Sequence, residues 1–361
     1  MSLSLGIVGL PNVGKSTLFN ALTRSKQANV ANYPFCTIEP NVGVVEVPDA
    51  RLPQLARVSN SKKVVPAAVE FVDIAGLVKG ASEGEGLGNK FLSHIREADA
   101  IVHVVRAFSD NDITHVHSQV DPKFDAEIIN LELALADAQT VSKRLGALTK
   151  NAKSAGAPEE KKQSELLGRV LAHIQSGQAA RALAYNEDET KWMKELQLLT
   201  MKPMMYVVNV DELVDFRLQT SDFGLGESAI VVPVSAKLEA ELADLSAEDA
   251  LAYMKELGME QSGLDKIIVA GYKLLNLITY FTSGEPETRA WTVRMGACAP
   301  EAAGVIHTDF VKGFIKADVC QWQEFLEGKG WAGAREQGKL RLEGKEYVVQ
   351  DGDVCYFHVA T

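Results

Sequence analysis

The residues with the clearest chemical capacity form a phosphate-binding loop. Residues 9–16 are Gly-Leu-Pro-Asn-Val-Gly-Lys-Ser, which completes the pattern G-x-x-x-x-G-K-S. In this pattern the glycines let backbone N–H groups approach the α- and β-phosphates, and Lys15 reaches the β- and γ-phosphates. The Ser16 hydroxyl is placed to coordinate Mg²⁺. We therefore predict that six residues bind a nucleotide: Asn12, Val13, Gly14, Lys15, Ser16 and Thr17.

Two further segments have the spacing of switch elements around a γ-phosphate. Residues 73–76 are Asp-Ile-Ala-Gly, a D-x-x-G element, in which Asp73 would hold Mg²⁺ through a water and the Gly76 amide would sense the γ-phosphate. Thr37 lies between the two motifs, in the interval of the threonine that joins Mg²⁺ and the γ-phosphate. Residues 77–88 are rich in glycine, and we interpret them as a moving switch, with an ordinary surface loop as the alternative.

The segment expected to recognise the base departs from the guanine pattern. Residues 209–212 are Asn-Val-Asp-Glu, where a guanine-specific protein has Asn-Lys-x-Asp. The Asp of that motif accepts protons from two guanine donors and its Lys packs on the ring, but here Val210 and Glu212 take those positions. The amino group of adenine could be met by Asn209 or by a backbone carbonyl.

A second base-recognition segment indicates the opposite preference. Residues 235–237 are Ser-Ala-Lys, a loop whose amide would suit guanine O6. Weighing both segments, we expect ATP to be preferred, with GTP also possible. The base-side residues predicted to contact the nucleotide are Asn209, Val210, Glu212, Ser235 and Ala236.

Hydrolysis cannot use the usual glutamine, because Leu77 follows the D-x-x-G element and cannot orient a water. Asn12 could help to hold K⁺ near the phosphates, where the cation would supply positive charge to the transition state. His115, in a polar loop after the third predicted strand, is a candidate catalytic residue that could position the water. A solvated surface histidine is the alternative for His115.

The elements that must position these residues form an alternating α/β pattern. Apolar runs at residues 3–8, 68–72, 100–105, 203–208 and 230–234 are predicted strands, and several end directly before a motif residue. Residues 15–23 are a predicted helix after the phosphate-binding loop. This arrangement predicts a mostly parallel sheet that binds its ligand at the carboxyl edge.

Two other regions of the chain depart from this alternating α/β pattern. Apolar residues recur every three or four positions from Ile128 to Leu148, and apolar spacing continues over residues 167–174, which predicts an inserted helical hairpin with a turn near residues 151–158. Residues 143–202 carry 11 Lys and Arg against 7 Asp and Glu, so this insertion is locally basic. These basic residues could form a binding face, or they could belong to a solvated helix face.

The end of the chain is predicted to be a small α+β domain. We expect strands at residues 291–295, 346–349 and 354–359, a helix at 318–326, and a turn at 351–353.

Composition limits the possible classes. The chain has 361 residues, 46% of them hydrophobic and 24% charged, with a formal net charge of −11. This acidic balance argues against a general nucleic-acid coat, and no stretch has the length and apolarity of a membrane span. Four cysteines lie far apart and form no zinc spacing, which favours reduced thiols in a cytoplasmic protein.

Taken together, residues 9–20, 33–41 and 73–89, with the non-guanine Asn-Val-Asp-Glu, resemble the YchF / Obg-like ATPase family of P-loop proteins. Residues 303–315 and 349–354 resemble a TGS domain, a ubiquitin-like β-grasp module. The resemblance implies a P-loop nucleotide domain (1–124 and 200–277), a coiled-coil-like helical insertion (125–199) and a TGS domain (278–361).

The same resemblance implies slow ATP hydrolysis with Mg²⁺, stimulation by K⁺, and association with the ribosome, the large subunit and its RNA in particular. No membrane partner is expected, and a monomer is favoured. Two other functional classes remain for comparison. One is a small-molecule kinase, against which the D-x-x-G element and the absence of a lid Arg cluster argue. The other is a nucleotide-stabilised ribosome- or RNA-binding scaffold whose hydrolysis is incidental.

Overall fold

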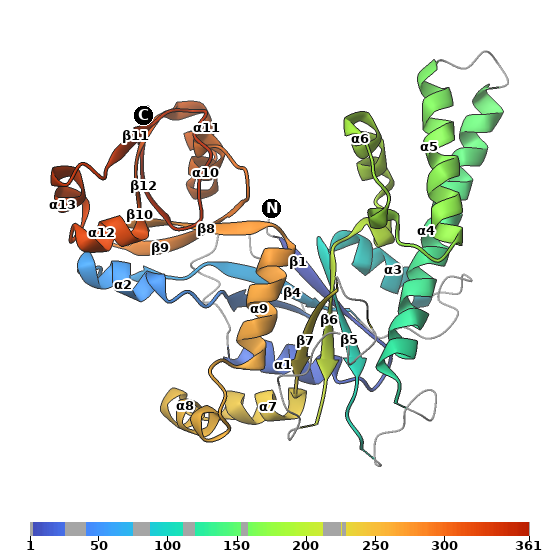
Figure 1. The fold of residues 1–361 in the computed structure, drawn as a ribbon, viewed down its shortest axis with the longest axis horizontal. Helices are drawn as coiled ribbons and strands as arrows, with labels where there is room; N and C mark the ends of the chain where they lie inside the picture. Colours follow the sequence, from blue (N-terminus) through green and yellow to red (C-terminus); the bar gives the residue numbers. More distant parts are fainter. Residues whose placement is uncertain are drawn as a thin grey trace.

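The computed structural model describes residues 3–25, 41–74, 87–110, 120–152, 158–211, 225 and 229–360, with the side chains of residues 87–90, 150–152 and 247 left out. Two six-stranded sheets and a helical hairpin organise these residues (Figure 1).

The first sheet has the strand order β2-β4-β1-β5-β6-β7, parallel except for β2, which runs antiparallel to β4. Its strands are β1 (Ser4–Val8), β2 (Val42–Glu46), β4 (Ala68–Asp73), β5 (Ala100–Arg106), β6 (Met204–Asn209) and β7 (Ile230–Val234). The predicted α/β fold with a mostly parallel sheet is confirmed. Only β2 was not predicted from the sequence.

Helices pack on this sheet through short apolar faces. α1 (Lys15–Ser25) follows the phosphate-binding loop and contacts α7 (Ala236–Asp244), which begins directly after β7. α9 (Gly263–Leu274) packs on β5, β6 and β7, and a Cβ at its Gly271 would press on the Leu5 side chain. α3 (Leu87–Glu97) and α8 (Ala247–Glu256) complete this region.

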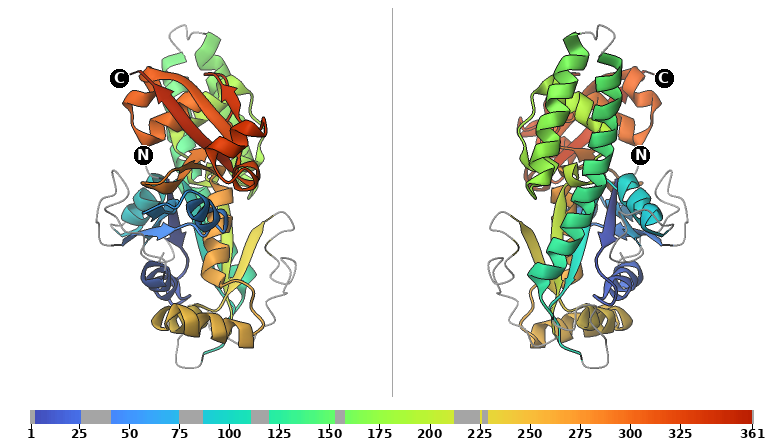
Figure 2. Two further views of the ribbon diagram at one scale, coloured as in Figure 1. Left: turned by 90° about the vertical axis from the view of Figure 1, so that its left-hand side faces the viewer. Right: turned by 90° about the vertical axis from the view of Figure 1, so that its right-hand side faces the viewer.

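The helical hairpin lies between β5 and β6 in the chain. It consists of α4 (Pro122–Ala152), α5 (Pro158–Gln175) and α6 (Glu187–Leu196), with short 3-10 turns η3 (Ala180–Ala182) and η4 (Leu199–Met201). α4 and α5 pack side by side through Val141, Leu148 and Val170, and they project away from the sheet (Figures 1 and 2).

The apolar stripe predicted along the first of these helices is only partly buried. Leu131 and Leu135 were included in that stripe, yet they are 58% and 44% exposed. The first half of α4 instead buries Ile129 and Leu133 in the main core, and its second half turns Val141 toward α5. A helix that contacts two different partners along its length needs two buried faces, and a single stripe does not describe it.

The second sheet has the order β11-β10-β12-β8-β9-β3. Its strands are β3 (Val64–Val65), β8 (Leu277–Ser283), β9 (Thr288–Arg294), β10 (Phe314–Gln321), β11 (Arg341–Glu343) and β12 (Asp353–Val359), and its helices are α10 (Ala299–Ile306), α11 (Asp309–Gly313), α12 (Trp322–Glu327) and α13 (Trp331–Glu336). The strands predicted at 291–295 and 354–359 are confirmed as β9 and β12.

Two predictions in this region are wrong. Residues 318–326 were expected to form one helix, but β10 continues to Gln321 and pairs with β12 at seven positions before α12 begins. This long-range pairing outweighs local helix preference. Residues 346–349 were expected to form a strand, whereas the strand is β11, and Val348 makes only an isolated bridge to Cys298.

The segment between β2 and β4 joins the two sheets. α2 (Arg51–Val58) packs on α12, and β3 pairs in parallel with β9. Leu55 of α2 lies in the same buried cluster as Leu5 of the first sheet and Phe281 of the second. Arg51 Nη1 lies 2.6 Å from Asp351 Oδ2 and adds an ion pair to this junction. The two sheets therefore share one continuous core.

None of the helices in the described part of the chain combines the length and the apolar character that a membrane crossing requires.

Candidate functional site

The phosphate-binding loop lies between β1 and α1 in a backbone conformation that its sequence requires. Gly14 has φ +96°, and a Cβ there would overlap the side-chain nitrogen of Asn209. Asn12 has φ 62° in the left-handed region, which asparagine tolerates better than most residues. Both residues allow the loop to curve tightly at the carboxyl end of β1, where its amides can surround phosphate oxygens.

Lys15 is buried at the start of α1. Its Nζ donates a hydrogen bond to the Leu10 carbonyl oxygen at 2.7 Å, so the side chain folds back over the loop. Burial lowers the pKa of Lys15 to about 8, and the negative charge of Asp73 opposes this shift. A phosphate group would supply the negative charge that favours the protonated form.

Ser16 and Asp73 meet where a divalent cation would be expected. The Ser16 hydroxyl donates to Asp73 Oδ2 at 3.1 Å, which joins α1 to the end of β4. The other carboxylate oxygen, Oδ1, is buried, and among the described residues it has no hydrogen-bond partner. Hydroxyl and carboxylate oxygens are the ligands that Mg²⁺ prefers, so these two residues fit the predicted metal site.

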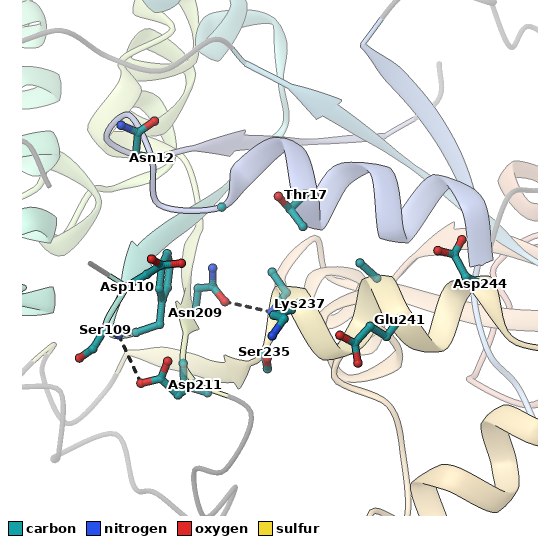
Figure 3. Close-up of a pocket in the computed structure, with 15 residues that line it drawn as sticks. Asn12, Thr17, Ser109, Asp110, Asn209, Asp211, Ser235, Lys237, Glu241 and Asp244 are labelled. Atoms are coloured by element: carbon teal, nitrogen blue, oxygen red, sulfur yellow. Dashed lines mark hydrogen bonds between the residues drawn. The ribbon is translucent and has the colours of Figure 1, made fainter. Parts of the chain in front are cut away.

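The Asn209 side chain forms hydrogen bonds that connect three segments of the chain. Its Nδ2 donates to the Val13 carbonyl oxygen at 3.0 Å, and its Oδ1 accepts from the Ala236 amide at 2.9 Å. Asn209 therefore ties the phosphate-binding loop to the end of β6 and to the start of α7. Figure 3 shows the bond to the start of α7. The side chain was predicted to contact the base, and here its amide holds the surrounding loops together.

The neighbouring base-side residues are also used in packing. Val210 is 3% exposed and packs with Val105 and Val208, while its amide donates to Val234 O at 2.9 Å. The Ser235 hydroxyl caps α7 by accepting from the Leu238 amide at 3.3 Å.

A cavity of about 1150 Å³ opens beside the phosphate-binding loop. Predicted residues in its lining are Asn12, Gly14, Thr17, Asn209, Val210, Ser235 and Ala236. Val13 is not among them and is buried. The sequence did not identify further lining residues after β5, after β6 and on α7: Phe108, Ser109, Asp110, Asp211, Glu241 and Asp244. The segment after β5 could have been found, since ligands bind at the carboxyl ends of parallel strands.

Five predicted residues lie outside the described residues, so their geometry is not assigned: Thr37, Gly76, Leu77, His115 and Glu212.

A loop of amides at the carboxyl end of β1, a buried lysine and a Ser–Asp pair at the metal position define a P-loop nucleoside triphosphate hydrolase. Comparison with known proteins agrees. Residues 4–136 match a family described as 50S ribosome-binding GTPase, and residues 277–360 match the YchF GTPase carboxyl-terminal family, described as a protein of unknown function. The chain belongs to the YchF family.

Full-length relatives support this assignment. A protein from Bacillus subtilis named ribosome-binding ATPase YchF is 55% identical over 364 residues, and the match covers 99% of both chains. A protein of the same name from Pasteurella multocida is 50% identical over 361 residues, again with 99% of each covered. The structure of the Schizosaccharomyces pombe YchF GTPase matches with a TM-score of 0.88 at 42% identity, covering 99% of this chain and 98% of that one.

Proposed function

We propose that this protein is a ribosome-associated switch that prefers ATP over GTP and hydrolyses the γ-phosphate slowly. The relatives named ribosome-binding ATPase YchF support ATP as the nucleotide and the ribosome as the partner. The residues of the cavity support the preference for the adenine base.

One hydrogen bond carries the argument for ATP. In the guanine-binding pattern the amide of the Ser-Ala-Lys loop is available to guanine O6, but here the Ala236 amide is directed to Asn209 Oδ1 at 2.9 Å. A buried amide that already has an acceptor gains little from a second one. The same bond also engages the Asn209 oxygen, which leaves a backbone carbonyl as the acceptor for the adenine amino group.

The apolar walls of the cavity agree with this preference. Val210 supplies no cationic stem over the base because its side chain packs in the core. The Phe108 side chain is the aromatic residue in the described lining, and an aromatic surface suits a purine without demanding paired guanine donors. Glu212 would complete this side of the site.

At the phosphate end of the site, positively charged groups would stabilise the bound phosphates. Lys15 and the loop amides would hold the phosphates, and Ser16, Asp73 and Thr37 would hold Mg²⁺, which when bound neutralises charge on the β- and γ-phosphates. The Gly76 amide would sense the γ-phosphate. Asn12, at the cavity edge, would help to hold an activating K⁺. Since Leu77 cannot orient water, His115 remains our candidate for that role.

The expected partner is the ribosome, its large subunit and RNA in particular, and the expected compartment is the cytoplasm. We propose a nucleotide domain (1–124 and 200–277), a helical insertion (125–199) and a TGS domain (278–361). The latter two would supply the ribosome contacts. A monomer would suffice for this function.

The test is ATP turnover with and without ribosomes, in Mg²⁺ and K⁺, with Lys15→Ala as the inactive control. The proposal predicts faster turnover with ribosomes, and ribosome binding that differs between ATP and ADP. Binding that ignores the nucleotide, with turnover unchanged by ribosomes, would contradict the switch and favour the scaffold function.

A further inference from the structure

Residues 107–110 form one wall of the base cavity, here called the base wall. The backbone of this wall surrounds one buried cation, the side chain of Arg106. Arg106, the last residue of β5, is 2% exposed. Its Nε donates to the Phe108 carbonyl oxygen and its Nη2 to the Asp110 carbonyl oxygen, each at 3.2 Å. Its guanidinium carbon also lies 4.3 Å from the centre of the Phe108 ring. A buried charge needs such partners, so it fixes the backbone that supplies them.

A second tether holds the same loop from the β6 side. The Ser109 amide donates to Asp211 Oδ2 at 3.3 Å, and the Ala107 amide donates to the Asn209 carbonyl oxygen at 2.8 Å. Figure 3 shows Ser109 and Asp211 next to each other, joined by this bond. Because Asn209 also holds the phosphate-binding loop, these bonds link the base wall to the phosphate site.

We infer that Arg106 and Asp211 are positioning residues that set the distance between the base wall and the phosphate-binding loop, and thereby the affinity for the nucleobase. This inference rests on the proposed nucleotide function and adds two residues to it. Neither is argued to touch the phosphates. Phe108, Ser109, Asp110 and Asp211 line the cavity, and the hydrogen bonds of Arg106 and Asp211 hold the loop in place.

The two positions differ in how cleanly they can be tested. Replacing Arg106 also removes core packing, because the side chain is fully buried. Asp211 is exposed, so Asp211→Ala should fold normally while it removes the acceptor for the Ser109 amide. Asp211→Asn keeps a carbonyl oxygen in the same place and is the matched control. Arg106→Lys keeps the positive charge but loses the forked guanidinium group that reaches two carbonyl oxygens. It serves as the second variant.

The experiment compares binding of ATP and of inorganic tripolyphosphate, each with Mg²⁺, to the full-length wild-type protein and its variants. Tripolyphosphate has no base and reports on the phosphate site alone. Loss of one hydrogen bond to a carboxylate should weaken ATP binding about tenfold in Asp211→Ala. Binding of tripolyphosphate should change less than about twofold, well below the tenfold expected for one lost charged hydrogen bond. Asp211→Asn should recover most of the ATP affinity, and Arg106→Lys should show the same selective loss as Asp211→Ala.

Two results would overturn the inference: ATP affinity unchanged in Asp211→Ala, or equal losses for ATP and tripolyphosphate in that variant. Failure of the proposed function has a different signature. In that case the wild-type protein itself would bind ATP no better than tripolyphosphate, or would prefer GTP.

Discussion

Lys15 is the residue on which the phosphate site depends most directly. In the nucleotide-free protein its pKa is lowered to about 8, mainly by burial. Above that pH the side chain is largely neutral in the free protein, and phosphate binding must then take up a proton. The ammonium form, which binds phosphate, is therefore the form that rising pH removes.

We expect the affinity for MgATP to be constant from pH 6.5 to 7.5 and to fall above pH 8, by up to about tenfold per pH unit. Calorimetric titration in buffers of different ionisation enthalpy would measure both the affinity and the proton uptake. Equal affinity at pH 7 and pH 9.5, with no proton uptake, would contradict this assignment of Lys15.

His103, in the middle of β5, is a second buried titratable residue close to the site. It is 1% exposed and packs 5.2 Å from the Tyr206 ring, and among the described residues its two ring nitrogens have no hydrogen-bond partner. Burial, and then the charge of Lys15, lower its pKa to about 3. Between pH 6.5 and 3 the unfolded chain therefore binds a proton that the folded chain does not, so acid destabilises the fold.

The contribution of His103 can be isolated by substitution. On going from pH 7.5 to 5.0, wild type should lose about 2 kcal/mol more unfolding free energy than His103→Leu, from about 1.4 kcal/mol per pH unit below 6.5. Urea unfolding at the two pH values measures this difference. Parallel losses in the two proteins would show that His103 is not the responsible group.

The sequence motifs predicted the positions in the fold of several proposed site residues. Lys15, Ser16, Asp73 and Asn209 lie where the motifs predict, although the Asn209 amide holds loops together. The segment that contains Phe108 could have been placed at the carboxyl edge of the sheet, but its bonds to Arg106 and Asp211 could not be predicted, because contacts between neighbouring strands are not visible in a linear pattern.

At the scale of elements, the strands that form apolar runs in the first sheet were the easiest to predict. β1, β4, β5, β6 and β7 were each located to within a residue at either end. β2 was missed because it contains Gly43, which weakens a strand signal. A Cβ at Gly43 would collide with the Thr23 side chain, so the glycine is needed for α1 to approach.

The junction between α2 and the second sheet gives a prediction at this scale. Arg51 bonds to Asp351 and lies 5.0 Å from the centre of the Phe281 ring, while Asp351 Oδ1 accepts from the Thr279 amide at 2.9 Å. We expect Arg51→Ala to lower the free energy of unfolding by about 1–3 kcal/mol, because a half-buried charge network loses its cation.

The matched control is Arg24→Ala, whose ion pair with Asp244 is largely exposed, with both side chains about two-thirds exposed. That variant should remain within about 0.5 kcal/mol of wild type. Denaturant unfolding followed by tryptophan fluorescence measures both. Equal effects of the two substitutions would show that the junction adds no stability.

At the scale of the whole molecule, the two sheets share a core. Leu55 of α2 is buried with Phe281 of β8 and Phe325 of α12. Removing residues 278–361 would expose that apolar face, so loss of ribosome binding in such a truncation would not distinguish a lost contact from a damaged fold. Surface substitutions in the full-length chain are the suitable test of ribosome contact.

The position of α4 suggests how nucleotide state could be transmitted. The helix starts at the carboxyl edge of the first sheet and runs to the tip of the hairpin, away from the nucleotide cavity (Figures 1 and 2). Its 31 residues span roughly 45 Å at 1.5 Å per residue. In the switch that we propose, a rod of this length would carry a small displacement at the nucleotide edge to the proposed ribosome contacts of the insertion.

We propose that this YchF family member selects ATP because the amide of its Ser-Ala-Lys loop is held by Asn209. The most direct measurement is competitive binding of ATP and GTP to nucleotide-free protein with Mg²⁺ and K⁺ present. We predict that ATP binds at least about tenfold more tightly, which corresponds to one well-made polar contact. Equal affinities, or a preference for GTP, would contradict the claim and would mean that the Ala236 amide is available to guanine after all.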